Sequence, residues 1–242
     1  MAGTPKNPEE IFAGFTADYK NALHNDLESI ILFGSGARSD YIPGRSDLNF
    51  LIVLSESAME RLDLLSLPVS KWRKRKVAIP VFMTEAALCS SVDAYPVEFL
   101  NMQRNYRTVH GKDVLAGLRF DPAHVRLQCE RELKGKALLL LQRYMATEGN
   151  ARKIRELIAD SITAFISVFR ALLHLKGESI PESRREVVRA TAQHYGIDLN
   201  VFIHCIDIKE GILSFSKQEV RDIFGGYLKE VRRLADLIDQ WK

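Results

Sequence analysis

The residues with the clearest chemical potential lie at two neighbouring turns between residues 30 and 54. One hydrophobic run ends in Gly34 and Ser35, and after a polar loop a second run opens with Asp47 and Asn49. A glycine at such a turn lets the backbone approach a phosphate group closely, and a serine hydroxyl can hold its oxygens. Residues two apart on a strand point to the same side, so Asp47 and Asn49 would face one metal ion together. The pattern predicts a site for nucleotide phosphates beside a divalent metal.

Nucleotidyl transfer is a reaction that needs such a site. A hydroxyl attacks the α-phosphorus of a nucleoside triphosphate, and two Mg²⁺ ions ~3.5–4 Å apart commonly hold the attacking and leaving oxygens. Hard carboxylate oxygens are their usual ligands, and an Asp-x-Asp pair would supply two carboxylates. This sequence has Asp47 but carries Asn49 at the second position. We therefore expect Asp47 to be the principal Mg²⁺ ligand and Asn49 a weaker, uncharged one.

Alternating helices and strands in the first half of the chain are expected to position these residues. Asn7, followed by a proline and two acids, is typical of a helix start, and the helix should run to about His24. The apolar runs 29–33 and 48–54 predict two buried strands. Next are expected a helix at 57–75, interrupted or kinked near Pro68, and a strand at 77–83, where Pro80 forces an irregularity or an edge position. Helices from Thr84 and at 96–103 and a small strand at 107–110 should follow.

Strand signals end near residue 121, and amphipathic helices follow. They are predicted at 122–145, 151–176, 181–194, 199–209 and 216–241, with breaks at Gly149, Gly177, Gly196 and Gly211. Helices joined by short loops imply a bundle. The expected fold class is α+β, with a small α/β domain over residues 1–120 and an all-α helical bundle over residues 121–242.

The segment 30–54 resembles the signature of the DNA polymerase β-like nucleotidyltransferase superfamily. It is most similar to the minimal bacterial and kanamycin nucleotidyltransferase-like enzymes, which read roughly Gly-Ser-x-Ala-Arg-Gly, a loop, and Ser-Asp-x-Asp. Residues 34–38 read Gly-Ser-Gly-Ala-Arg, and residues 46–49 read Ser-Asp-Leu-Asn. The resemblance is strong over this segment and extends more weakly to about residue 115. In the family, a helical bundle often follows the α/β domain.

The resemblance implies an activity and a set of site residues. The activity would be transfer of a nucleoside monophosphate from a triphosphate to a hydroxyl of a small molecule or protein, with Mg²⁺ as cofactor. Gly34, Ser35, Arg38 and Ser46 would bind the nucleotide, and Asp47 would be catalytic. The acceptor hydroxyl is expected to approach from a cleft between the two domains, where ligand sites tend to form.

The sequence departs from the family pattern in ways that weaken the metal site. Besides Asn49, Ser39 replaces the glycine after the arginine, and the loop to Asp47 is longer than usual. The family's third carboxylate commonly lies on the strand equivalent to 77–83, which has no acid here. Glu85, Glu98 and, within the loop, Asp40 are the alternative acids.

Two other functions remain open at this point. The first is a catalytically degenerate nucleotidyltransferase fold that binds a nucleotide or a protein without turnover. The second is ribonuclease chemistry in the helical half, because Arg189 and His194 resemble the Arg…His motif of HEPN-type ribonucleases. The spacing of this pair arises easily by chance on a helix surface.

Composition narrows the partners. The chain has 34 basic and 31 acidic residues, a net charge of +3, so nucleic acid is not an expected partner. The basic run 71–76 around Trp72 could contact phosphates, with the indole stacking on a base, but a solvated helix end is favoured.

No apolar run approaches the ~20 residues that span a bilayer, and no signal peptide is evident. Cys89, Cys129 and Cys205 are expected to be buried free thiols, and the chain to be cytoplasmic. A homodimer is left open.

Overall fold

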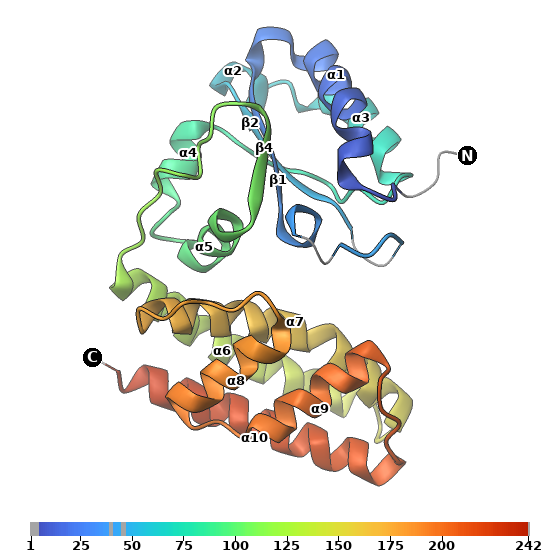
Figure 1. Cartoon of the computed structure of the whole chain (residues 1–242), viewed down its shortest axis with the longest axis vertical. Coiled ribbons are helices and arrows are strands. Elements are labelled where there is room, and N and C mark those ends of the chain that lie inside the picture. Colours follow the sequence, from blue (N-terminus) through green and yellow to red (C-terminus); the bar gives the residue numbers. More distant parts are fainter. Residues whose placement is uncertain (1–4, 39–40, 45–46, 242) are drawn as a thin grey trace. The chain divides into compact units, whose positions relative to one another are not determined.

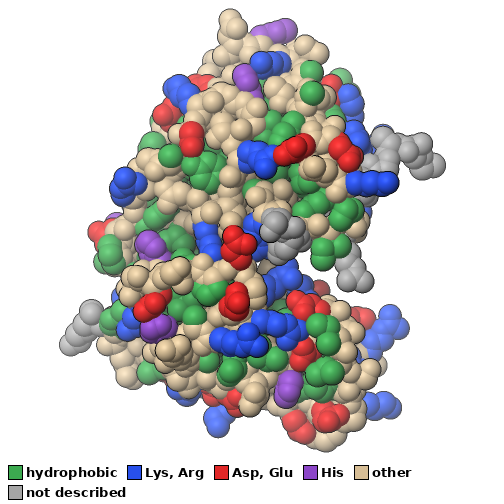
Figure 2. Space-filling view, viewed as in Figure 1, with side chains coloured by type: hydrophobic (Ala, Val, Ile, Leu, Met, Phe, Trp, Pro, Cys, Tyr) green, Lys and Arg blue, Asp and Glu red, His purple; other side chains and the backbone are tan. Residues whose placement is uncertain are grey.

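The computed structural model describes residues 5–38, 41–44 and 47–241, which form two compact units, 1–120 and 121–242. The first unit combines a sheet with helices and the second is helical, so the predicted α+β class is confirmed (Figure 1). Basic and acidic side chains are interspersed over the face shown in Figure 2, as the small net charge of +3 suggests.

The first unit is built around four strands in the order β3-β2-β1-β4. Its strands are β1 (Leu27–Phe33), β2 (Asn49–Leu54), β3 (Val81–Met83) and β4 (Tyr106–Gly111). Its helices are α1 (Phe12–Leu23), α2 (Glu56–Met59), α3 (Ser66–Arg73), α4 (Glu85–Ser90) and α5 (Pro96–Arg104), and its short 3₁₀ helices are η1 (Pro8–Ile11), η2 (His24–Asp26), η3 (Gly34–Ala37) and η4 (Leu62–Leu65).

Strand β1 lies at the centre of the sheet, antiparallel to both neighbours, whereas β2 and β3 run parallel. Successive side chains alternate between the two faces. On one face Ile30 and Leu32 join a core that includes α1 and the buried Trp72 of α3. On the other, Ile31 and Leu51 join a core that includes α4 and α5. Both faces are covered, which explains why residues 30–33 of β1 and 50–54 of β2 are continuously apolar.

Two predicted elements differ from the structure. The expected helix at 57–75 is divided into α2, η4 and α3, and Pro68 lies in the first turn of α3, where its missing N–H costs no helical hydrogen bond. The expected strand at 77–83 is reduced to β3, preceded by a single bridge between Leu48 and Val77. Pro80 lies in the gap, where it cannot donate to the ladder.

The second unit consists of long helices whose N-terminal caps can be recognised from the sequence. They are α6 (Pro122–Met145), α7 (Ala151–Leu175), α8 (Arg184–Tyr195), α9 (Leu199–Glu210) and α10 (Lys217–Asp239). Ser216 and Glu219 form the predicted capping box at the start of α10. Helix α7 contacts α6, α8, α9 and α10, which makes it the core helix of the bundle.

Helix α7 is also long and apolar enough, by length and composition, to be a candidate membrane span. Its most apolar window has a mean hydropathy of 1.5, but 56% of that window is buried within the structure. A core helix passes the same test, because burial in protein and burial in lipid select similar side chains. The helix contains no long uninterrupted apolar run, because scattered polar residues divide it, and the sequence expectation therefore did not identify it as a candidate span.

The cysteines fit the expectation only in part. All three are free, and Cys129 and Cys205 are buried, whereas Cys89 is exposed on α4. Burial raises the pKa of the Cys205 thiol, because the charged thiolate would be poorly solvated there. The expectation of a buried thiol was therefore wrong for Cys89.

Candidate nucleotide-binding site

The turn that follows β1 has the backbone conformation that a glycine permits. Gly34 has a φ of 72°, in the left-handed region, and it opens the single turn of η3. Its N–H donates to the carbonyl of Asn105 at 3.1 Å. Asn105 connects α5 to β4, so this bond fixes the turn to the start of the neighbouring strand. Ser35 follows, half-buried.

Asn49 lies directly beside this turn. It pairs with Phe33 across the β1–β2 ladder. A Cβ atom added to Gly34 would lie 3.7 Å from the Nδ2 atom of Asn49, so the amide is packed against the glycine. The structure therefore brings together Gly34 and Asn49, which are separated by the loop in the sequence.

Asp47 is positioned by the buried residue that follows it. Leu48 is fully buried, donates through its N–H to the carbonyl of Lys76, and accepts through its carbonyl from Ala78 at 3.0 Å. Because side chains alternate along extended backbone, anchoring Leu48 in the core directs Asp47 and Asn49 away from it. Asp47 is exposed and Asn49 is half-buried. One carboxylate and one amide are thus presented at the end of β2.

Tyr41 belongs to the surroundings of Asp47, although the motif gave no reason to select it. Its hydroxyl donates to the carbonyl of Pro5 at 3.1 Å. Burial raises the pKa of Tyr41, and the negative charges of Glu10 and Asp47 raise it further. The phenol therefore stays neutral near Asp47 and ties the loop to the segment that precedes η1.

The structure supplies no third carboxylate from β3. The bridge of Leu48 with Val77 and the pairing of Leu51 with Val81 place residues 78–80 alongside Asn49, and these are Ala, Ile and Pro. Among the residues that the structure describes, no group of three or more His, Cys, Asp or Glu side chains could hold a metal ion. Asp40 and the predicted nucleotide-binding residue Ser46 lie outside the described residues.

Glu85 cannot replace the missing acid. Its carboxylate pairs with Lys112 at 3.1 Å, and Lys112 follows Gly111, which lies opposite Ser29 near the start of β1. The turn at Gly34 is at the other end of β1, roughly 15 Å away at the usual rise per strand residue. Glu98 is exposed on α5, and no metal-binding group that includes it is found among the described residues.

The donor set of the described residues fits one Mg²⁺ better than two. Mg²⁺ is usually bound through one or two carboxylates together with substrate phosphates. Asp47, with Asn49 beside it, meets that minimum when a triphosphate provides the other oxygens. The described residues at the turn lack the second and third carboxylates that would hold a pair of ions.

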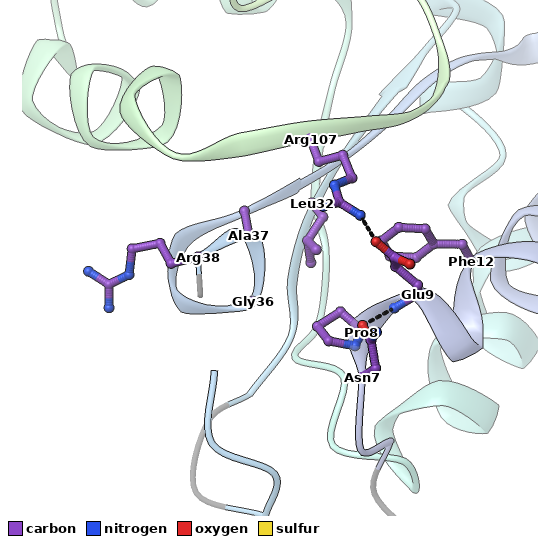
Figure 3. Close-up of a pocket in the computed structure, with 9 residues that line it drawn as sticks. All are labelled: Asn7, Pro8, Glu9, Phe12, Leu32, Gly36, Ala37, Arg38 and Arg107. Atoms are coloured by element: carbon purple, nitrogen blue, oxygen red, sulfur yellow. Dashed lines mark hydrogen bonds and ion pairs between the residues drawn. The ribbon is translucent and has the colours of Figure 1, made fainter. Parts of the chain in front are cut away.

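A pocket of about 250 Å³ borders the same turn (Figure 3). Gly36 and Ala37 of η3 form one wall, and η1 with Phe12 forms another. Arg107 of β4 forms an ion pair across the pocket with Glu9 of η1. Arg38 also lines the pocket, but Figure 3 shows its side chain extending away from this pair.

Gly36 is required for the packing of the turn, which leads to a stability prediction. A Cβ atom there would lie 2.7 Å from Cδ2 of Leu48 and 3.1 Å from Cδ1 of Leu32. We expect Gly36→Ala to lower the free energy of unfolding by about 1–3 kcal/mol, the usual cost of overpacking, in a chemical denaturation experiment. Gly117→Ala is the matched control, because nothing lies within 4 Å of its added Cβ. Equal stability of the two variants would show that the turn is not packed in this way.

Two alternatives from the sequence are not supported by side-chain placement. Trp72 is buried and donates through Nε1 to Asp18 at 2.7 Å, so its indole is not available to stack on a base. Arg189 and His194 are both exposed on α8, and five residues of helix place them about 140° apart. His194 lies 3.4 Å from Glu178. No contact joins this arginine to this histidine among the interactions of the described residues.

The chain, an α/β unit followed by a helical unit, has the fold of a solved nucleotidyltransferase. A solved structure that is similar over almost the whole chain is the spectinomycin adenyltransferase AAD(9) from Enterococcus faecialis, determined with ATP and spectinomycin. The similarity has a TM-score of 0.57 at 15% sequence identity and covers 93% of this chain and 98% of that chain. No family model matches the sequence, and no curated protein matches it. The predicted fold is therefore confirmed at the level of three-dimensional structure.

Proposed function

We propose that this protein is a nucleotidyltransferase that transfers a nucleoside monophosphate from a triphosphate to a hydroxyl of a small molecule or protein. The observation that carries the proposal is the contact of the Gly34 turn with Asn49, two residues after Asp47, at one end of the sheet. The first unit would be the nucleotidyltransferase domain and the second its helical partner. The similar adenyltransferase was determined with ATP and spectinomycin, which supports a nucleoside triphosphate as donor and a small molecule as acceptor.

Each residue of the site has a defined role in this proposal. Gly34 allows close approach of the phosphates, and Ser35 donates its hydroxyl to a phosphate oxygen. Arg38 contributes positive charge near the β- and γ-phosphates, and Ser46 is a further predicted phosphate ligand. Asp47 would hold Mg²⁺ with the weaker help of Asn49, and the ion would neutralise charge on the phosphates.

Pyrophosphate release tests the proposal directly. The protein should be incubated with ATP, GTP, CTP or UTP, with Mg²⁺ or Mn²⁺, and with a panel of acceptors that includes aminocyclitols, nucleosides and protein hydroxyls. We expect pyrophosphate release with at least one triphosphate, dependent on both metal and acceptor. If no triphosphate releases pyrophosphate with any acceptor, the result would count against nucleotidyl transfer.

A second function, nucleotide binding without transfer, is favoured by one specific observation. The described residues beside Asn49 include no further carboxylate, and metal-assisted transfer depends on an intact ligand set. Such a protein would bind a nonhydrolysable triphosphate in calorimetry yet release no pyrophosphate. Absence of binding would leave the fold as a scaffold for a protein partner.

A further inference from the structure

The pocket between η1 and the Gly36–Ala37 wall carries an ion pair that the proposed reaction does not use. Glu9 and Arg107 meet across it, each with about half of its side chain exposed. Glu9 comes from the N-terminal segment and Arg107 from β4, so the pair connects two elements that are far apart in the sequence. Pairs this exposed contribute little to stability, because solvent screens the two charges. A ligand of higher charge can therefore displace one partner.

Arg107 is within reach of the phosphate turn. It pairs with Leu32 on β1, and the preceding residue of β4 pairs with Phe33, which directly precedes Gly34. Paired residues on adjacent strands have Cα atoms about 5 Å apart. Since Gly36 and Ala37 line the same pocket, a phosphate held in it would meet the turn on one side and Arg107 on the other.

The cap of η1 does not use the carboxylate of Glu9, which is therefore available to pair with Arg107. Glu10 is occupied in the helix cap, where its carboxylate accepts the N–H groups of Asn7 and Lys6. The N–H of Glu9 is bound by the side chain of Asn7, but its carboxylate is directed to Arg107. The cap therefore holds η1 in place without the Glu9–Arg107 contact.

We propose that Arg107 is a phosphate-binding residue and that Glu9 occupies it in the free protein. The ligand is a phosphoryl oxyanion, either the terminal phosphates of a bound nucleotide or pyrophosphate. A guanidinium binds two oxygens of a phosphate in parallel, and a phosphate carries more negative charge than the carboxylate it replaces. On binding, Arg107 exchanges Glu9 for the phosphate. Competition from Glu9 therefore lowers the affinity of the protein for phosphate. The nucleotide part of this inference rests on the proposed function, whereas the pyrophosphate part does not.

Isothermal titration with ATP and, separately, with pyrophosphate tests the exchange, each with Mg²⁺ and with EDTA. We expect Arg107→Gln to weaken binding about tenfold, the size of one lost charge-assisted contact. Glu9→Gln should tighten binding about threefold, because a competing carboxylate and a repelling charge are removed. In the Arg107→Gln background, Glu9→Gln should have a smaller effect than in the wild type, because the competition for Arg107 is gone and only the removal of a repelling charge remains.

The matched control is the exposed pair of Arg61 with Asp26, which precedes β1 and lies at the end of that strand opposite Gly34. Arg61→Gln removes the same charge and should leave both affinities unchanged. Equal affinities of the wild-type and Arg107→Gln proteins for both probes would overturn the proposal, as would an effect of Glu9→Gln that is undiminished in the double variant. Weakening with ATP alone assigns Arg107 to the nucleotide. Failure of ATP to bind, with Arg107-dependent pyrophosphate binding retained, contradicts the proposed function but not the phosphate subsite.

Discussion

Replacing Asp47 with asparagine is expected to reduce pyrophosphate release by about 10²–10³-fold, the usual cost of removing one electrostatic group from a catalytic site. Asp47 is an exposed carboxylate two residues before Asn49, which contacts Gly34 and itself lacks a charge. The substitution keeps the shape of the side chain and removes the charge that attracts Mg²⁺. Initial rates at saturating triphosphate and metal measure the effect.

The same variant separates binding from transfer. ATP affinity in Mg²⁺ should fall toward the affinity measured in EDTA, because Asp47 no longer links the metal to the protein. Asp63→Asn on η4 is the control, since it removes an equal charge from an exposed residue in the segment after β2, away from Asn49. A variant that keeps the full metal dependence of ATP binding would show that Asp47 is not the ligand.

Restoring the second acid should act in the opposite direction. We expect Asn49→Asp to raise Mg²⁺ affinity about tenfold, because ligand charge strongly tunes the affinity of such sites. Asn49 is half-buried and packed against Gly34, so an aspartate of the same shape would be held in the same position. If the rest of the site is intact, the rate of pyrophosphate release rises as well.

A charge-matched variant makes the result specific. Asn25→Asp adds the same charge to an exposed residue of η2, before β1 and far from Gly34. It should change neither metal affinity nor rate. If Asn49→Asp also leaves Mg²⁺ affinity unchanged, the end of β2 is not presented to the metal as we describe.

Local sequence signals predicted much of the first unit correctly. The cap at Asn7, the apolar strands β1 and β2, and the turn at Gly34 each depend on short-range preferences that neighbouring residues record. The helix expected at 57–75 is interrupted, but ahead of Pro68 rather than at it, because proline is tolerated in a first helical turn. The strand expected at 77–83 was too long, because a ladder requires a paired partner that a local pattern does not specify.

The sequence by itself determined the class of fold and the position of the turn at Gly34, since strand periodicity, capping and the Gly-Ser signature are local properties. Only the tertiary structure decided which residues share the site. Asn49 lies against Gly34, and Ala78, Ile79 and Pro80 lie beside Asn49. Glu85 lies at the far end of the sheet. The tertiary structure also brought Glu9 and Arg107 together across the pocket that the turn borders. These contacts depend on strand order and register, which arise from packing between distant segments and leave no mark at any one position of the chain.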